Sequence, residues 1–313
     1  MTATSAPGPS AKSGRTVGFA FVLGAALSWS LAGIGIKSVA LPGLAIVGLR
    51  SLLALPVFAL VLWLRAGQNL PLVLRLGLGR PITWLASACY AWTMLSFVLA
   101  AKLTTAANAI LLQYTAPIYV VLLSWPLLGE KIGVADVLAV LGCFLGIAWF
   151  FVEQLSTSGL YGNLLALSSG AGLGLLPLLL RRTERPDPSH DAQSRELLPF
   201  VPTLVLLLGN VLAVLAGLAA MLRQPVPSLS AWLWLAVLGV VQIALAYLLY
   251  AAAVRRLRPV ECLMLASLEP ILNPIWVALF AGELPSRAAI CGGLLILASV
   301  TGHGIYSALR PRH

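Results

Sequence analysis

The sequence predicts an all-α membrane protein in which ten transmembrane helices form two inverted five-helix repeats. Three observations lead to this prediction: the hydrophobic composition, the length of the apolar runs, and the recurrence of one motif in both halves. Of the 313 residues, 60% are hydrophobic and 10% are charged. A soluble domain carries about 25% charged residues, because its surface faces water. Lipid is therefore expected to surround most of this chain.

Ten apolar runs are long enough to cross a bilayer, since an α-helix needs about 20 apolar residues to span the hydrocarbon core. The runs occupy residues 17–36, 44–64, 82–101, 104–128, 133–152, 160–180, 198–222, 230–253, 260–281 and 287–308. Most connections between them are short, which favours antiparallel neighbours. Residues 181–196 form the one long polar connection and are charged and rich in proline. We expect a cytoplasmic loop there, between helices six and seven.

The distribution of Lys and Arg predicts the orientation. With the N-terminus inside, 15 of the 20 basic residues fall on the cytoplasmic side and four on the other, while Arg50 lies within a helix. Cytoplasmic loops carry such an excess. Both termini, including the N-terminal tail 1–15, are therefore expected on the cytoplasmic face of a bacterial-type inner membrane. The basic residues are not interleaved with stacking aromatics, so the net charge of +10 does not indicate nucleic-acid binding.

The sequence lacks the motifs of the common catalytic and metal sites. Its four cysteines lie inside apolar runs without a CxxC pair, and its three histidines are scattered. No HExxH, GxSxG or GKS/T signature is present. The glycine-rich stretch 170–174 lies within an apolar run and follows no strand, so it indicates close helix packing rather than phosphate binding. We expect no enzyme activity, no metal and no cofactor.

The two halves of the chain resemble each other. A shift of 153 residues places Pro117 on Pro270 and Gly129-Glu130 on Gly282-Glu283. The expected repeats are residues 16–153 and 160–309. Because each holds five helices, an odd number, the second must enter the membrane from the opposite side. Two inverted units packed around one site can rock so that the site opens to each side in turn, although shared ancestry kept only for packing would leave the same pattern.

Three groups of residues carry a family resemblance. They are Trp29-Ser30-Leu31-Ala32-Gly33, Pro117 with Gly129-Glu130-Lys131, and Leu268-Glu269-Pro270 with Gly282-Glu283. Over residues 15–308 the chain resembles the drug/metabolite transporter (DMT) superfamily in its ten-helix EamA-type branch, and it is most similar there to YddG-type exporters of aromatic amino acids. The resemblance implies metabolite export through a central cavity lined mainly by helices 1, 3, 4, 6, 8 and 9. In the second copy Leu284 stands where the first has Lys131, so the helix-capping and loop-pairing role of Glu130-Lys131 need not recur.

Two charged residues lie away from the ends of predicted spans, where a charge at helix centre costs roughly 2.5–3.5 kcal/mol on insertion scales. Arg50 could attract a substrate carboxylate, or it could be a structural charge that pairs or reaches toward an interface. Glu269, directly before Pro270, could bind a substrate ammonium or carry a coupling proton. Alternatively, Glu269 is a partner for Arg50 or for backbone groups that the proline leaves free.

The remaining candidates are aromatic or amide side chains that could contact a solute, or could instead serve in packing and interhelical hydrogen bonding. The full set of candidate cavity residues is Trp29, Tyr90, Trp92, Asn108, Tyr114, Ser168, Gln242, Tyr247, Tyr250, Glu269 and Asn273, with helix breaks or hinges at Pro117 and Pro270. We therefore expect a monomeric secondary transporter that exports amino acids, aromatic ones preferred, by alternating access. The alternative is a carrier of other metabolites, of drugs, or of a lipid-linked group.

Overall fold

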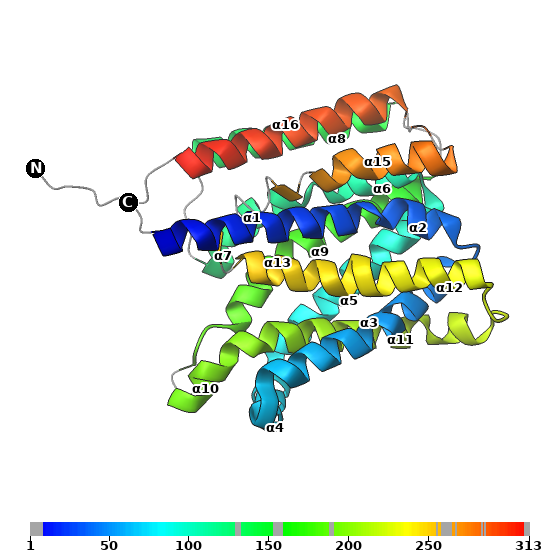
Figure 1. Ribbon diagram of the computed structural model, residues 1–313. Coiled ribbons are helices and arrows are strands. Elements are labelled where there is room, and N and C mark those ends of the chain that lie inside the picture. The colour runs from blue at the N-terminus through cyan, green and yellow to red at the C-terminus, as the bar shows by residue number, and fades with distance from the viewer. Residues whose placement is uncertain are drawn as a thin grey trace, which may run out of the picture.

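The computed structural model describes residues 9–309 apart from 129–132, 153–158, 188–190, 255, 258–264, 267, 283 and 285. Within these ranges the regular structure is helical and no strand occurs. Figure 1 shows the long helices running roughly side by side from one end of the molecule to the other. This arrangement is expected in lipid, because a helix satisfies its backbone hydrogen bonds within its own segment.

The elements up to residue 152 are α1 (Pro9–Ser30), α2 (Ala32–Ser38), α3 (Gly43–Ala66), η1 (Gly67–Asn69), α4 (Leu70–Leu78), α5 (Pro81–Leu103), α6 (Ala106–Gln113), α7 (Ala116–Leu128) and α8 (Val134–Val152). Those that follow are α9 (Leu160–Thr183), α10 (Ala192–Leu197), η2 (Leu198–Phe200), α11 (Val201–Leu222), α12 (Leu229–Ala236), the π-helical segment η3 (Val237–Leu245), α13 (Ala246–Val254), α15 (Leu268–Ala281) and α16 (Arg287–Leu309). Several of these elements continue one another along a common axis (Figure 1).

Six helices in the described part of the chain are long and apolar enough to cross a membrane. They are Thr16–Ser38, Gly43–Leu78, Pro81–Leu103, Leu160–Thr183, Ala192–Leu222 and Leu229–Ala253. The other predicted runs fall on α6 with α7, on α8, on α15 and on α16. These lengths fit a bundle that crosses the bilayer several times.

Two predicted runs that were expected to be continuous are interrupted. The run 17–36 is divided at Leu31, between α1 and α2. The run 104–128 is divided at Tyr114 and Thr115, and Pro117 becomes the second residue of α7. Proline is accepted there because the first turn of a helix has no partner for its N–H groups.

The polar connections contain more helix than the sequence predicts. The predicted extent of the loop 181–196 is wrong at both ends. The helix α9 continues to Thr183, and α10 covers Ala192–Leu197. The connection before α5 contains α4, which is too short to span and buries Val73 and Gly77. Both short helices lie at the end of the bundle where α1 begins and α16 ends (Figure 1).

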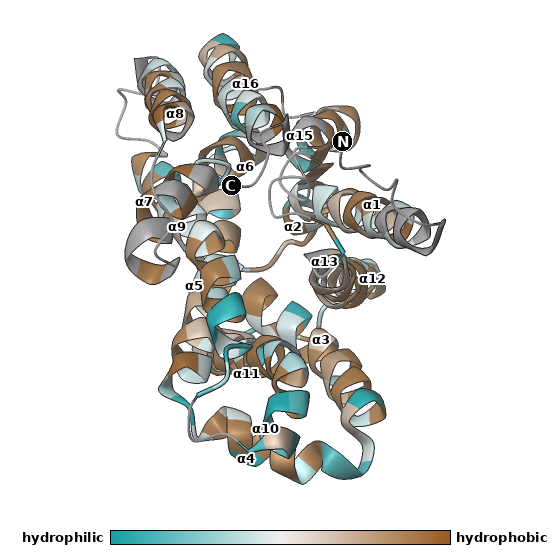
Figure 2. Ribbon diagram, turned by 90° about the vertical axis from the view of Figure 1, so that its left-hand side faces the viewer, coloured by the Kyte–Doolittle hydropathy of each residue, from teal (hydrophilic) through white to brown (hydrophobic). Residues whose placement is uncertain are grey.

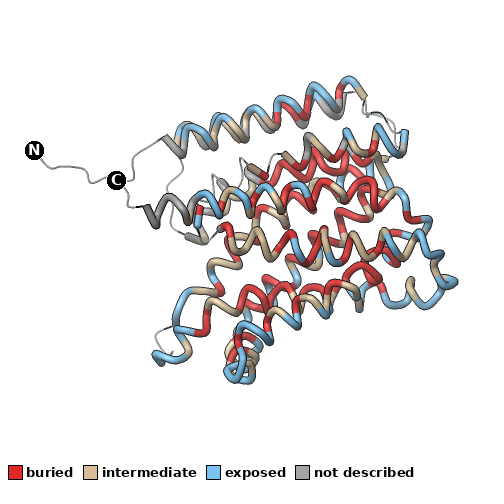
Figure 3. Tube along the Cα trace, viewed as in Figure 1, coloured by how far each residue is buried: buried red, intermediate tan, exposed pale blue. Residues whose placement is uncertain are grey.

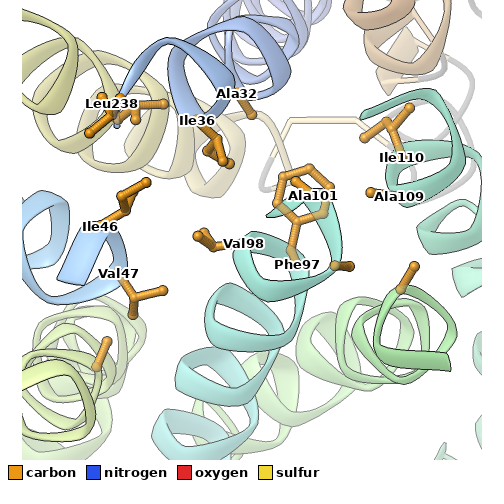
Figure 4. Close-up of a cluster of buried hydrophobic side chains, with 14 of the residues drawn as sticks. Ala32, Ile36, Ile46, Val47, Phe97, Val98, Ala101, Ala109, Ile110 and Leu238 are labelled. Atoms are coloured by element: carbon orange, nitrogen blue, oxygen red, sulfur yellow. The ribbon is translucent and has the colours of Figure 1, made fainter. Parts of the chain in front are cut away.

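The core consists of buried apolar side chains between the central helices, and two clusters matter for the site. The first joins α2, α3, α5, α6 and η3 around Ile36, Val98 and Ile110 (Figure 4). The second joins α1, α3, α5, α11 and α13 around Phe58 and Ala246. Buried positions concentrate in these central helices, whereas α16 is largely exposed along its outer side (Figure 3).

The outer surface of the bundle is apolar. Leu64, Leu145 and Leu279 are each exposed by more than 60%, and hydrophobic residues cover most of the helices in Figure 2. Hydrophilic residues gather instead at α10 and the segments beside it (Figure 2). Such a surface is unfavourable in water and suits lipid.

Glycine allows close helix contacts, as the stretch 170–174 predicts. A Cβ on Gly170 would lie 2.8 Å from the Gln113 carbonyl oxygen, and one on Gly174 would collide with the Ala116 carbonyl oxygen. The close packing of α9 against the α6–α7 region is therefore confirmed, and no side chain fits between these backbones.

Candidate functional site

Arg50 lies on the eighth position of α3 and is fully buried. Its Nη1 donates to Gln242 Oε1 at 3.2 Å and its Nη2 donates to the Met94 carbonyl oxygen at 3.2 Å. These bonds join α3 to η3 and α5. Nε has no hydrogen-bond partner among the described residues. The side chain therefore remains in the interior and does not reach toward a membrane interface, which excludes the snorkelling alternative.

Four aromatic rings from three helices contact one another next to Arg50. Trp29 of α1 lies 5.2 Å, between ring centroids, from both Tyr247 and Tyr250 of α13. Tyr90 of α5 meets Tyr247 edge to face at 5.0 Å. These separations are those of favourable aromatic pairs. We call Trp29, Tyr90, Tyr247 and Tyr250 the aromatic cluster.

Glu269, the second residue of α15, is 7% exposed. The Tyr114 hydroxyl lies 3.0 Å from its Oε2 and 2.6 Å from the Ala266 carbonyl oxygen. Tyr114 occupies the interruption between α6 and α7. The interruption between α6 and α7 is thus hydrogen-bonded directly to the beginning of α15.

Tyr247 connects the two charged groups. Its hydroxyl is near enough to both Arg50 and Glu269 to interact electrostatically with each. Arg50 and Glu269 themselves form no ion pair, and within the described ranges neither is paired with any opposite charge. The hypothesis that Glu269 is the partner of Arg50 is therefore wrong. Arg50 and Glu269 are thus both buried near Tyr247 of the aromatic cluster without being bonded to each other.

A buried amide lies one helical turn beyond Glu269. Asn273 is fully buried, and neither its Oδ1 nor its Nδ2 has a partner in the part of the chain that the structure describes. Its Oδ1 packs directly against Gly33, just after the interruption at Leu31, where any Cβ would collide with it. Beside it, Trp276 Nε1 donates to Ser30 Oγ at 3.1 Å. Since residues four apart share a helix face, Glu269 and Asn273 lie on the same side of α15.

Three predicted cavity residues are either exposed or hydrogen-bonded within their own part of the chain. Trp92 is 47% exposed and is not part of the aromatic cluster. Asn108 donates to Thr104 Oγ1 within its own segment, and Ser168 donates to the Leu165 carbonyl oxygen one turn earlier. The other predicted positions, Trp29, Tyr90, Tyr114, Gln242, Tyr247, Tyr250, Glu269 and Asn273, lie at the site or directly beside it.

The predicted helix breaks are described only through their backbone. Pro117 lies directly after the interruption between α6 and α7, and Pro270 is the third residue of α15. The motif residues Gly129, Glu130, Lys131 and Glu283 lie outside the described residues.

The sequence analysis missed groups that complete the site. Asn210 of α11 donates to the Tyr90 hydroxyl at 3.2 Å and so orients one ring of the aromatic cluster. As a lone amide in the run 198–222, it could have been selected from the sequence. The carbonyls of Met94 and Ala266 also take part, and no side-chain pattern marks a backbone acceptor. Among the residues that the structure describes, no group of three or more His, Cys, Asp or Glu side chains could hold a metal ion.

Comparison with known proteins places this arrangement in context. Residues 16–152 and 160–303 each match the EamA-like transporter family. An uncharacterized transporter of Archaeoglobus fulgidus is 27% identical over 240 residues, which covers 74% of this chain and 79% of the relative. A solved crystal structure superimposes with a TM-score of 0.64 at 22% identity and covers 95% of this chain and 99% of its own. That likeness concerns the fold alone.

Proposed function

We propose that this chain, which belongs to the EamA-like transporter family of the DMT superfamily, exports amino acids across the inner membrane and prefers aromatic ones. The family makes it a multi-pass membrane transporter and not an enzyme. One observation carries the choice of substrate: an aromatic cluster lies beside a buried guanidinium, Arg50, and a buried carboxyl, Glu269, that are not bonded to each other.

An amino acid offers the complementary charges. Its carboxylate would accept hydrogen bonds from the Arg50 guanidinium, which has N–H groups beyond those given to Gln242 and Met94. Its ammonium would lie against the Glu269 carboxylate. Unpaired charges in a low-dielectric interior are costly, so a ligand that neutralises both would be held strongly.

The aromatic cluster would select the side chain of the substrate. Trp29 and Tyr247 present ring faces and edges next to the two charges, and an indole or phenyl group can stack there at typical distances. An aliphatic amino acid would keep its charge contacts and lose the ring contacts. We therefore propose a preference for aromatic side chains within a broader amino-acid range.

We further propose that ten crossings form two inverted repeats, 16–153 and 160–309, with both termini in the cytoplasm. The two separate family matches, one in each half, support the division. The basic excess on one side supports the orientation, as does the common end at which α1 begins and α16 ends (Figure 1). Rocking of the two units, with Pro117 and Pro270 as hinges, would expose the site to each side in turn.

Counterflow in proteoliposomes tests the substrate. Vesicles loaded with unlabelled tryptophan or phenylalanine should accumulate the labelled amino acid without ATP, and alanine should exchange more weakly. The matched control is Trp92→Phe, which changes an exposed indole outside the aromatic cluster and should leave the rates unchanged. Exchange of drug cations, other metabolites or lipid-linked groups with no exchange of any amino acid would establish the alternative carrier function instead.

A further inference from the structure

The two distances around the Tyr114 hydroxyl indicate which group carries the proton. A tyrosine hydroxyl has one proton, and here it faces two oxygens, at 2.6 Å from the Ala266 carbonyl and 3.0 Å from Glu269 Oε2. The carbonyl can only accept, and its shorter distance lies near the usual O–H···O length. The hydroxyl proton therefore goes to Ala266. The second bond then needs a proton from Glu269, so the carboxyl donates to the Tyr114 oxygen.

The surroundings of Glu269 agree with a neutral carboxyl. α15 packs against α1, α2 and α6. The charged residues of α1 are Lys12 and Arg15, near its beginning, and that of α2 is Lys37, whose Nζ donates to the Thr104 carbonyl oxygen. α6 contributes no charged side chain, only Tyr114 at its end. From α13, Tyr247 interacts electrostatically with both Glu269 and Arg50.

No cation among the described residues is therefore paired with Glu269. An ionised carboxylate buried without a counter-charge is strongly unfavourable. A carboxyl that holds a proton and donates it to Tyr114 avoids this cost. The Tyr114 oxygen then accepts the Glu269 proton, and the Ala266 carbonyl oxygen accepts the Tyr114 proton. Each of the two protons thus has one acceptor.

We propose that Glu269 is the proton-binding site of this transporter and that its proton exchanges with the substrate ammonium. One proton leaves the carboxyl when the ammonium arrives, and one returns when the ammonium leaves, so the charge at Glu269 stays balanced in both states. An inward proton gradient would then drive export of the substrate. The identity of the displacing cation rests on the proposed amino-acid function, whereas the proton site itself does not.

Infrared difference spectroscopy of the purified, full-length protein in liposomes tests the proton site directly. The carbonyl stretch of a protonated carboxylic acid should be present near neutral pH, absent in Glu269→Gln, and retained in Glu196→Gln, which removes an exposed carboxyl of α10. Tyr114→Phe should shift the frequency of the band, because it removes the acceptor of the carboxyl proton. A wild-type spectrum without this band at neutral pH overturns the proposal, whether or not the variants fold.

Addition of tryptophan links the proton to transport. The acid band of the wild type should decrease, and a pH dye inside proteoliposomes should report proton movement opposite to that of tryptophan. If Glu269→Gln transports tryptophan with an unchanged rate and pH dependence, the proton role is wrong. If the band is present but no amino acid is transported, the amino-acid function fails and the proton site stands.

Discussion

Arg50 and Glu269 are both buried in the interior of the bundle and do not bond to each other. Arg50 donates to Gln242 and to the Met94 carbonyl, whereas Glu269 is bonded to Tyr114. Tyr247 interacts electrostatically with both. A structural ion pair would have joined the two side chains directly, whereas here each keeps a separate set of hydrogen-bond partners.

Arg50→Lys should reduce tryptophan counterflow by about tenfold or more. Lysine keeps the positive charge but cannot reproduce the planar fork that binds Gln242, Met94 and a carboxylate together, and losing one charge-assisted hydrogen bond costs about 1.5–3 kcal/mol. The measurement is the initial counterflow rate, with a thermal unfolding curve to show that the variant is folded. A folded Arg50→Lys with wild-type rates would contradict the role of the guanidinium.

Trp29→Ala should weaken the preference for aromatic substrates. Each aromatic pair contributes about 0.5–1.5 kcal/mol beyond its buried area, and Trp29 contacts both Tyr247 and Tyr250. The ratio of phenylalanine to alanine counterflow should fall several-fold. Trp92→Ala removes an equally large ring that is 47% exposed, and this control should keep the ratio. Equal losses in both variants would show that the aromatic cluster does not select the substrate.

Gly33→Ala should destabilise the protein by about 1–3 kcal/mol, the usual cost of overpacking. The added Cβ would collide with Asn273 Oδ1 and lie 2.9 Å from Val277 Cγ2. Asn273→Ala in the same chain should restore part of the stability, since it removes the obstructing amide. The control is Gly302→Ala, where no atom lies within 4 Å of the new Cβ. Equal unfolding midpoints for Gly33→Ala and Gly302→Ala would refute this close approach of α2 and α15.

Arg80→Gln should lower the unfolding midpoint measurably, by about 1 kcal/mol or more in free energy. The Arg80 guanidinium donates to the Thr183 carbonyl oxygen at 2.5 Å and to the Arg185 carbonyl oxygen at 3.0 Å, and so caps the end of α9. Arg75→Gln, at an exposed position of α4, serves as the matched control. If the two substitutions lower the midpoint equally, the cap contributes nothing specific.

The long helices were predictable because lipid forces each crossing segment to satisfy its own backbone. The predicted runs 82–101 and 160–180 accordingly lie within α5 and α9. The interruption at Tyr114 and Thr115 has a marker in Pro117. The interruption at Leu31 has none, since no proline occurs there.

Which face of a helix points inward was harder to predict. Trp92 was placed in the cavity together with Tyr90, yet residues two apart on a helix point about 200° away from each other. Tyr90 is buried and Trp92 is exposed, so depth in the membrane alone was a poor guide.

Hydrogen bonds between distant segments could not be predicted from the sequence either. Tyr114 and Glu269 are separated by 155 residues, and the second acceptor of Tyr114 is a backbone carbonyl.

Competition between tryptophan and its two truncated analogues tests the central claim most directly. Tryptamine lacks the carboxylate that Arg50 would bind, and indole-3-propionate lacks the ammonium that Glu269 would bind. Unlabelled tryptophan should abolish counterflow of labelled tryptophan, while each analogue at equal concentration should compete at least about tenfold more weakly, because each lacks the group that would bind one of the two side chains. Competition by either analogue as strong as that of tryptophan would show that Arg50 and Glu269 do not bind the carboxylate and the ammonium of an amino acid.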